Sequence, residues 1–526
     1  MVEYHVRLLI CIILLLQECL PLEIVAHIGC IADLRSTANL RSTCRPFFEI
    51  ISNKIFTIYN IREENVQLLL RPLGRLKQIS IEFRNVPKKS IDDPLPIFKE
   101  IGSLDIHRLN INDFLHMEAL TRLAHLNNTL ESLEANNVRN DVLDQFYNLK
   151  RLVLSNSTVQ LGKLTKLEEL HLVHSDYIQN VNAPKLTKLV IKYGYNLTLR
   201  LFNADKNKLQ NLKSLEVFGS HFSYVPCLTT LESLTTDGRI NSLDISSMTK
   251  LTRLELSGTC FGREEDPEDL ANWTRLTKLK VLHITDTINK FVKSIAFMSK
   301  LPLTTATISG VTRDDAECIQ HLKPHLIHKL SVDINNSSMF KQHLTRLSRL
   351  EALTIRSSTP VVVDGIDTLT LLTRLVLVKS QCKFIERLTK LQVLRADLTP
   401  TNMSGWTALM NLHQFDATVP SQSIENIALF TKLEDLVLKF SEAFDSNALS
   451  SLTNLTRICL PGLNYSTLDW LAPLTKLECL NLQTSPISAR DLEALTKLGN
   501  LTKLVIQNAY KYRDGLTALT KLQAFQ

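Results

Sequence analysis

The 526-residue chain has few aromatic residues, few glycines and no long apolar segment. Aromatics make up 6 % of it although 44 % is hydrophobic, and leucine supplies most of the difference. With 15 glycines, phosphate-binding loops are scarce, and the motifs GxxxxGKS/T, GxGxxG and HExxH do not occur. The most apolar run, residues 8–16, is too short to span a bilayer. These absences argue against a nucleotide-binding enzyme, a zinc protease and an integral membrane protein.

Neither the net charge nor the cysteine pattern indicates a specialised function. The formal net charge is +7, from 60 basic and 53 acidic residues, and no dense Lys/Arg block occurs. This mixture of signs favours a protein partner over nucleic acid and predicts no membrane association. None of the ten cysteines forms a CxxC pair, which favours a reducing compartment, although an even count leaves a disulfide framework open.

Candidates for metal or cofactor chemistry are weak. The nearest approach to a metal site combines Glu317 with His321, His325 and His328, of which His321 and His325 have the spacing of one helix face. We interpret this group as the polar side of a helix. The sequence therefore predicts no catalytic residues, no cofactor and no metal ion.

The dominant feature is an internal repeat with the phrase L-T-K-L-x-x-L-x-L. From Leu350 onward its copies are spaced by 22, 19, 21, 21, 22, 22, 24 and 21 residues. Degenerate copies begin near Leu76, Leu130, Leu303 and Ile327. The sixteen clear copies begin at Leu149, Leu167, Leu186, Leu212, Leu231, Leu251, Leu279, Leu350, Leu372, Leu391, Leu412, Leu433, Leu455, Leu477, Leu501 and Leu522.

Each copy predicts a short strand. In the copy that begins at Leu433, residues Leu436 and Leu438 alternate as buried strand residues do, while Val437 and Lys439 point outward. One repeat cannot bury its own leucines, so stability comes from stacking on its neighbours.

The repeat resembles the leucine-rich repeat family over roughly residues 130–526, with a period in the family's range. The resemblance implies an α/β solenoid: a curved parallel sheet on the concave side, short helices and turns on the convex side. One departure concerns the ninth position, where the family prefers asparagine. Hydroxyls that can replace one of its backbone bonds stand there instead: Ser157, Ser175, Thr259, Ser380 and Ser485.

A second motif precedes the repeats. Pro21 is well placed to begin a helix, and Ile24, Ile28 and Ile31 then form one apolar stripe. The pattern L-P-x-E-I, then D-L, a leucine and C-R-x-F resembles an F-box over about forty residues. Thr43 and Phe47 depart from the usual valine and common tryptophan. The resemblance implies docking on a Skp-type adaptor of a cullin complex through Leu20, Pro21, Ile24, Ile28, Leu40, Cys44 and Phe47.

Together the two resemblances predict a substrate receptor of an SCF-type E3 ubiquitin ligase, cytoplasmic or nuclear, whose repeats bind an unknown target protein. The predicted divisions are an apolar segment (1–19), a helical F-box-like domain (20–60), a linker with degenerate repeats (61–130) and the repeat domain (131–526). The chain ends within a repeat without a polar cap, which suggests truncation or a covered edge.

Two alternatives stay open. Residues 8–16 resemble the apolar core of a secretory signal, whose cleavage would destroy the Leu20-Pro21 pair. Ten Asn-x-Ser/Thr sequons, Asn156 and Asn454 among them, would fit a secreted or cell-surface recognition protein. The other alternative is an intracellular scaffold in which residues 20–56 only cap the solenoid.

The concave face is the expected target site, because it presents an extended row of strand side chains. Exposed aromatic residues are better contact candidates than isolated lysines. The residues predicted to contact the target are Asn156, His171, His174, Lys192, Tyr193 and Phe218.

Overall fold

A computed structural model describes residues 55–59, 79–84 and 106–111, most of 124–506, and residues 519, 521–522 and 524–525. The gaps within 124–506 are 139, 159–160, 176–182, 195–208, 220–227, 238–244, 258–271, 286–291, 310–318, 335–339, 383–384, 397–403, 420–423, 441–445, 462–466 and 483–487. Among the described helices, none has the length and apolar character needed to cross a membrane.

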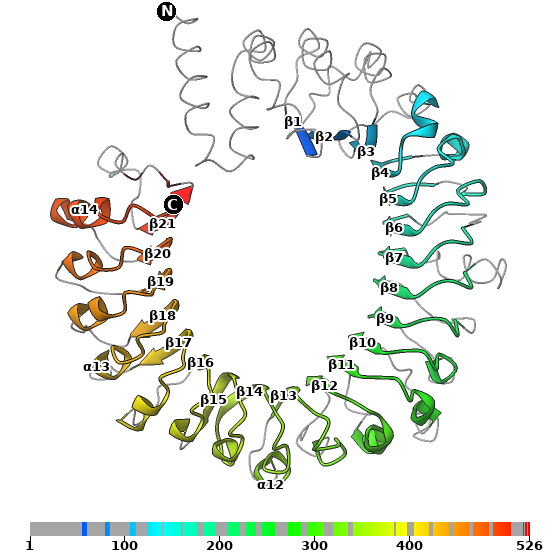
Figure 1. Cartoon of the computed structure of the whole chain (residues 1–526). Helices are drawn as coiled ribbons and strands as arrows, with labels where there is room; N and C mark the ends of the chain where they lie inside the picture. Colours follow the sequence, from blue (N-terminus) through cyan, green and yellow to red (C-terminus); the bar gives the residue numbers. More distant parts are fainter. Residues whose placement is uncertain are drawn as a thin grey trace, which may run out of the picture. The chain divides into compact units, whose positions relative to one another are not determined.

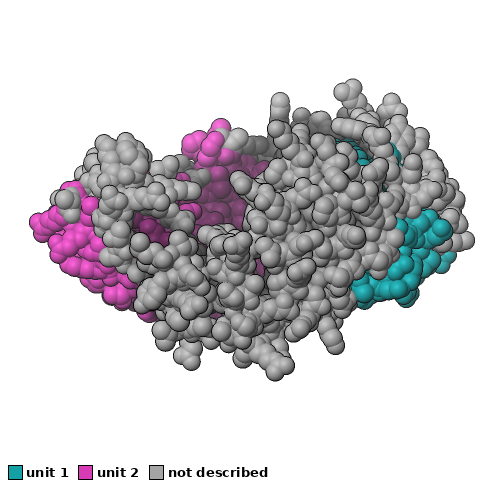
Figure 2. Space-filling view, turned by 90° about the horizontal axis from the view of Figure 1, so that it is seen from above, with its two compact units in different colours: residues 1–251, 260–263 teal, residues 252–259, 264–526 magenta. Residues whose placement is uncertain are grey.

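The chain divides into two compact units, coloured separately in Figure 2. Unit 1 comprises residues 1–251 and 260–263, and unit 2 comprises residues 252–259 and 264–526. Each is described by itself below.

In unit 1 every described strand pairs in parallel with the next one along the chain, and the strands lie on the inner side of the curve (Figure 1). The strands are β1 (Ile55–Tyr59), β2 (Ile79–Arg84), β3 (Ile106–Ile111), β4 (Ser132–Asn136), β5 (Arg151–Ser155), β6 (Glu169–Val173), β7 (Lys188–Lys192), β8 (Ser214–Phe218) and β9 (Ser233–Thr236). Two short 3-10 helices are described, η2 (Ala124–Asn128) and η3 (Asn140–Gln145).

Unit 2 repeats this arrangement, again with sequential parallel pairing. Its strands are β10 (Arg253–Ser257), β11 (Val281–Thr285), β12 (Thr305–Ser309), β13 (Lys329–Asp333), β14 (Ala352–Val363), β15 (Arg374–Cys382), β16 (Val393–Ala396), β17 (Gln414–Val419), β18 (Asp435–Phe440), β19 (Arg457–Cys459), β20 (Cys479–Leu482), β21 (Lys503–Ile506) and β22 (Ala524–Phe525).

Short helices lie on the outer side of unit 2 (Figure 1). They are η4 (Asn272–Arg275), η5 (Val292–Lys300), α12 (Phe340–Leu344), η6 (Ile366–Thr368), η7 (Ile385–Arg387), η8 (Ser404–Ala408), α13 (Ile424–Ile427), η10 (Ser446–Ser451), η11 (Asp469–Leu471) and α14 (Ala489–Thr496). The leucine-rich repeat solenoid predicted from the sequence is therefore the architecture of both units.

The repeat phrase sets the strand positions. In all sixteen clear copies the strand begins two residues after the first leucine, and fifteen of these leucines are fully buried. Burial of each side chain contributes roughly 1.5–3 kcal/mol. The degenerate copies at Leu130, Leu303 and Ile327 obey the same rule, and β12 and β13 pair in register. Strands β1 and β3 have no counterpart among the predicted copies.

The hydroxyl at the ninth position makes two hydrogen bonds in unit 1, not the single one expected. Ser157 Oγ accepts from Val138 N–H at 3.0 Å and donates to Ser155 O at 2.7 Å. Ser175 Oγ accepts from Ser157 N–H at 3.1 Å and donates to Val173 O at 3.0 Å. Both serines are buried, so the bonds satisfy backbone groups that water does not reach.

A second ladder runs along the turns before the strands of unit 2. The residue before each opening leucine alternates between lysine and asparagine from Lys390 to Lys521. Asn454 shows the pattern: its Nδ2 donates to Thr431 O at 2.9 Å, and its Oδ1 accepts from Lys476 Nζ at 2.7 Å. Asn411 and Asn500 are held in the same way. The Asn-Leu-Thr sequence at Asn454 and Asn500 therefore has a structural reason within the repeat.

Several sequence predictions lie outside the described residues. These are the apolar segment 8–16 and all seven predicted adaptor contacts. Strand β1 falls within the range 20–60 assigned to the F-box-like domain and pairs with β2. The proposed domain boundaries otherwise stay predictions.

Candidate binding face of unit 1

The concave side of unit 1 presents alternate residues of each strand. In β6 and β8 the second and fourth residues are buried, while the first, third and fifth are partly accessible. Parallel pairing in register places equivalent residues of neighbouring repeats side by side. The face is thus three rows of side chains crossing the strands.

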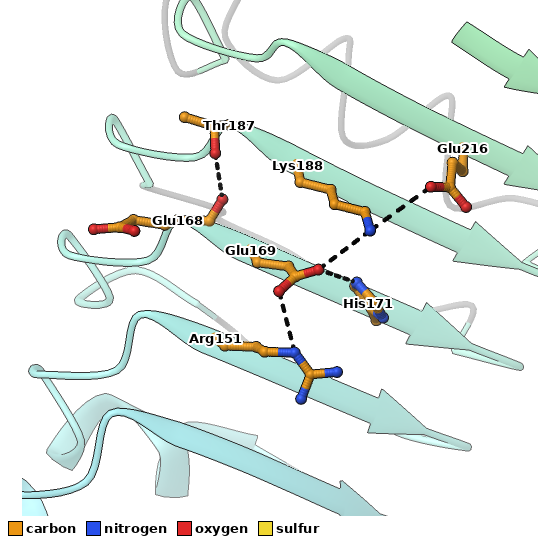
Figure 3. A network of polar contacts seen from close by, with 7 residues as sticks. All are labelled: Arg151, Glu168, Glu169, His171, Thr187, Lys188 and Glu216. Atoms are coloured by element: carbon orange, nitrogen blue, oxygen red, sulfur yellow. Dashed lines mark hydrogen bonds and ion pairs between the residues drawn. The ribbon is translucent and has the colours of Figure 1, made fainter. Parts of the chain in front are cut away.

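Charged residues in these rows form one network across β5–β8, drawn in Figure 3. The Glu169 carboxylate lies at its centre, 3.1 Å from Arg151 Nε, 2.8 Å from His171 Nε2 and 3.4 Å from Lys188 Nζ. Lys188 Nζ also lies 3.8 Å from Glu216 Oε1. The network ties four strands together.

The Glu169 carboxyl group at the centre of this network is ionised at neutral pH. Burial alone would raise the pKa of Glu169, but the hydrogen bond and charge of His171, with Lys188 and Arg151, hold that pKa below its ordinary value. The negative charge of this carboxylate is balanced by the neighbouring cations, so the network has little tendency to attract an additional ion.

A column of left-handed residues follows the strands at the edge of this face. The residue after each of β4–β8 has a positive φ, between 49° and 63°, in five successive repeats: Asn137, Asn156, His174, Tyr193 and Gly219. Asparagine and glycine adopt this conformation readily, whereas it is uncommon for a bulky side chain such as tyrosine. The first four donate their N–H to the last strand carbonyl of the next repeat, which holds the conformation.

The two aromatic members of the column form a platform. The rings of His174 and Tyr193 stack with centroids 4.7 Å apart and planes 12° from parallel. Gly219 makes room on the other side, because a Cβ there would lie 2.6 Å from Tyr193 Cδ1. Beside the column, Lys192 Nζ lies 5.9 Å from the centre of the Phe218 ring. Tyr193 keeps 48 % of its surface exposed although neighbours fix its position.

The six predicted contact residues come from four adjacent repeats. Asn156, His174 and Tyr193 lie in the left-handed column, and Lys192 and Phe218 lie next to it. His171 belongs instead to the Glu169 network. Whether any of them contacts a target stays a prediction.

Sequence reasoning missed Arg151, Glu169 and Lys188. They occupy the first residue of their strands, whereas the repeat phrase predicts outward positions only between and after the two buried leucines. A signal was present, since opposite charges alternate at this one position in three consecutive repeats.

The His171–Glu169 pair has the arrangement of a general base and its orienting carboxylate. Among the described residues, however, no hydroxyl or thiol is hydrogen-bonded to the second ring nitrogen. The described part of the chain also contains no group of three or more His, Cys, Asp or Glu side chains placed to hold a metal ion.

Comparisons with known proteins show similarity of fold only. No family model and no curated protein matches the chain. A leucine-rich repeat protein of Leptospira interrogans is 14 % identical, with 84 % of this chain and 98 % of that one covered and a TM-score of 0.36. The LRR ectodomain of the receptor kinase GASSHO1/SCHENGEN3 from Arabidopsis thaliana is 15 % identical, with 89 % and 68 % covered and a TM-score of 0.31.

The structure of a TLR13–ssRNA13 complex is 16 % identical, with 82 % of this chain and 85 % of that one covered and a TM-score of 0.45. Identities and scores this low carry no information about what this chain binds.

Proposed function

We propose that the chain is a non-enzymatic recognition protein that binds a partner protein on the concave face of unit 1. The observation that carries the proposal is the position of the Tyr193 ring. The ring is exposed, but it stacks on His174 on one side and lies close to the backbone of Gly219 on the other. A rigid, exposed aromatic side chain contributes binding energy with little loss of side-chain entropy, and tyrosine is enriched at binding hot spots.

The test compares three variants of the full chain by quantitative cross-linking and affinity capture from cells. Tyr193→Ala removes the ring, and Gly219→Ala keeps it but displaces it. Tyr147→Ala is the matched control, because Tyr147 is similarly exposed, at 41 %, on a turn after η3. We expect one set of partners to be lost with the first two variants and kept with the third. Partners kept by all three variants contradict the proposal.

We further propose that the partner is a ubiquitination target and that residues 20–47 dock on a Skp-type adaptor, which would place the protein in the cytoplasm or nucleus. This step rests on the sequence motif with Leu20, Pro21 and Cys44. In such a complex the chain needs no catalytic residue, because its contribution is to hold the target close to the ligase.

Co-purification of the full chain with a recombinant Skp-type adaptor tests the adaptor step. We expect binding by the wild type and none by a Leu20→Glu/Ile24→Glu variant whose circular dichroism shows folded repeats. If the variant unfolds the repeats, residues 20–56 are a cap of the solenoid. If the folded wild type does not bind the adaptor, the ligase proposal fails while the recognition face of unit 1 is tested separately.

A further inference from the structure

The concave face of unit 2 differs in charge from that of unit 1. Taking the first, third and fifth residues of strands β13–β21, seven positions are exposed, and all seven hold lysine or arginine. We call them the cationic rows: Lys329, Arg356, Arg374, Arg395, Lys439, Arg457 and Lys503.

The carboxylates at the same set of positions are less exposed than the cations. There are three, Asp333, Asp416 and Asp435, and none is exposed. Asp333 accepts a hydrogen bond from Ser309 at 2.7 Å, and Asp435 is buried, 3.6 Å from Arg457 Nε. Among the described strand residues at these positions, seven cations stand against three carboxylates, a surplus of four positive charges.

Most of these cations have no ion-pair partner among the described residues. Arg356 and Arg395 stand opposite Asp333 and Asp416 in register. Yet the ion pairs among the described residues of unit 2 involve Arg253, His283, Arg387, Arg457 and Arg490, so Arg457 alone of the cationic rows takes part in one. Arg356 donates only a long bond to Ser331 Oγ, at 3.4 Å.

The dimensions and lining of this face indicate the kind of partner. Nine strands at about 4.8 Å spacing extend over about 38 Å, the length of an extended peptide of about twelve residues. Besides the three carboxylates, the described positions between the cations hold small, hydroxyl, amide or aliphatic side chains such as Thr354, Gln414 and Val393. None of these described residues has an aromatic ring on which a nucleic-acid base would stack.

We propose that the concave face of unit 2, from β13 to β21, binds an extended Asp/Glu-rich segment of a partner protein. Each carboxylate of the segment would meet an exposed Lys or Arg, with the guanidinium groups of Arg356, Arg374 and Arg395 able to hold carboxylates bidentately. This surface is separate from the recognition face of unit 1, so either proposal can fail alone.

The test uses the full chain and a fluorescent, extended peptide of about twelve alternating Asp and Glu residues, with fluorescence anisotropy as the readout. A peptide with Asn and Gln replacing the acids and a single-stranded RNA of the same length are compared. The variant Arg356→Gln/Arg374→Gln/Arg395→Gln removes three cations of the face. The matched control, Arg346→Gln/Arg349→Gln/Lys390→Gln, removes three exposed cations outside the strands.

We expect salt-sensitive binding of the acidic peptide, no binding of its amide counterpart, and an affinity about tenfold lower in the first variant but unchanged in the control. A second variant, Lys439→Gln/Arg457→Gln/Lys503→Gln, should also weaken binding, because the proposed segment extends to β21. Equal losses in the face and control variants overturn the proposal, as does equal binding of the amide peptide. Tighter binding of RNA that depends on the same three arginines assigns the face to nucleic acid and overturns it as well.

Discussion

The two units share one backbone plan but treat charge on their concave faces in opposite ways. In unit 1 Arg151, Glu169 and Lys188 are partly buried and paired with one another across strands. In unit 2 the cations of β13–β21 are exposed, whereas the carboxylates at the same set of positions are half-buried or buried. The same parallel register therefore gives two different surfaces. In unit 1 the charged side chains pair with one another beside an aromatic platform, and in unit 2 most of the exposed cations have no ion-pair partner among the described residues. The difference lies in the balance of charge, because the described strand positions of β13–β21 hold seven exposed cations but only three carboxylates.

The largest expected effect tests whether the two units are separable. Leu170→Ala in β6 and Leu394→Ala in β16 each remove a fully buried side chain, which costs about 3 kcal/mol of stability. Because repeats contact mainly their neighbours, we expect amide hydrogen exchange measured by mass spectrometry to rise only in the unit that carries the change. A rise of equal size in both units would show that they unfold as one body.

The next effect concerns the serine ladder. Ser175→Ala leaves the buried Ser157 N–H without its acceptor, so we expect a loss of about 2 kcal/mol in the free energy of unfolding. Ser380→Ala in unit 2 removes a hydroxyl that donates to Val378 O, and about 1 kcal/mol is expected. Urea denaturation measures both losses. A larger loss at Ser380 would reverse the comparison.

The charge comparison itself predicts a smaller effect. Glu169→Gln should cost about 1 kcal/mol at neutral pH, whereas Arg374→Gln at an exposed, unpaired site should change stability by less than about 0.5 kcal/mol. Urea denaturation of both variants beside the wild type checks this. If Arg374→Gln costs as much as Glu169→Gln, the cations of unit 2 are engaged within the fold.

The pH dependence of this effect has a definite sign. The pKa of Glu169 lies below its ordinary value of 4.5 in the folded chain, so its ion pairs stabilise the fold above that value. The contribution disappears as the pH falls through the lowered pKa. Denaturation curves of the wild type and Glu169→Gln should therefore converge in acid, and a difference that persists there would contradict the assignment.

The smallest effect is a chemical one at Cys382, on the extended part of β15 that has no counterpart among the strands described in unit 1. Burial raises the pKa of this thiol to about 12, with Glu386 and Asp367 contributing, so the reactive thiolate is scarce. We expect iodoacetamide to modify Cys382 slowly at mildly alkaline pH and quickly in urea, as followed by peptide mapping. Equally fast modification in both conditions would mean that the end of β15 is open to solvent.

The repeat phrase was sufficient to locate the strands because their positions depend on short-range sequence. Leucines two residues before each strand, and at its second and fourth positions, must be buried, and the parallel register follows from stacking one repeat on the next. Strands β1 and β3 escaped prediction because their copies of the phrase are eroded. The aromatic platform was partly predictable, since His174 and Tyr193 directly follow their strands.

What the sequence determined by itself was the repeat: the apolar period fixes one strand for each copy and decides which residues are buried. What only the tertiary structure decided was the relation between repeats, because Arg151, Glu169 and Lys188 are separated along the chain and meet only when strands align side by side. The same holds for the left-handed column that stacks His174 on Tyr193 and for the greater exposure of the cations than of the carboxylates in unit 2. Those features depend on distances between residues of different repeats, which a period does not encode.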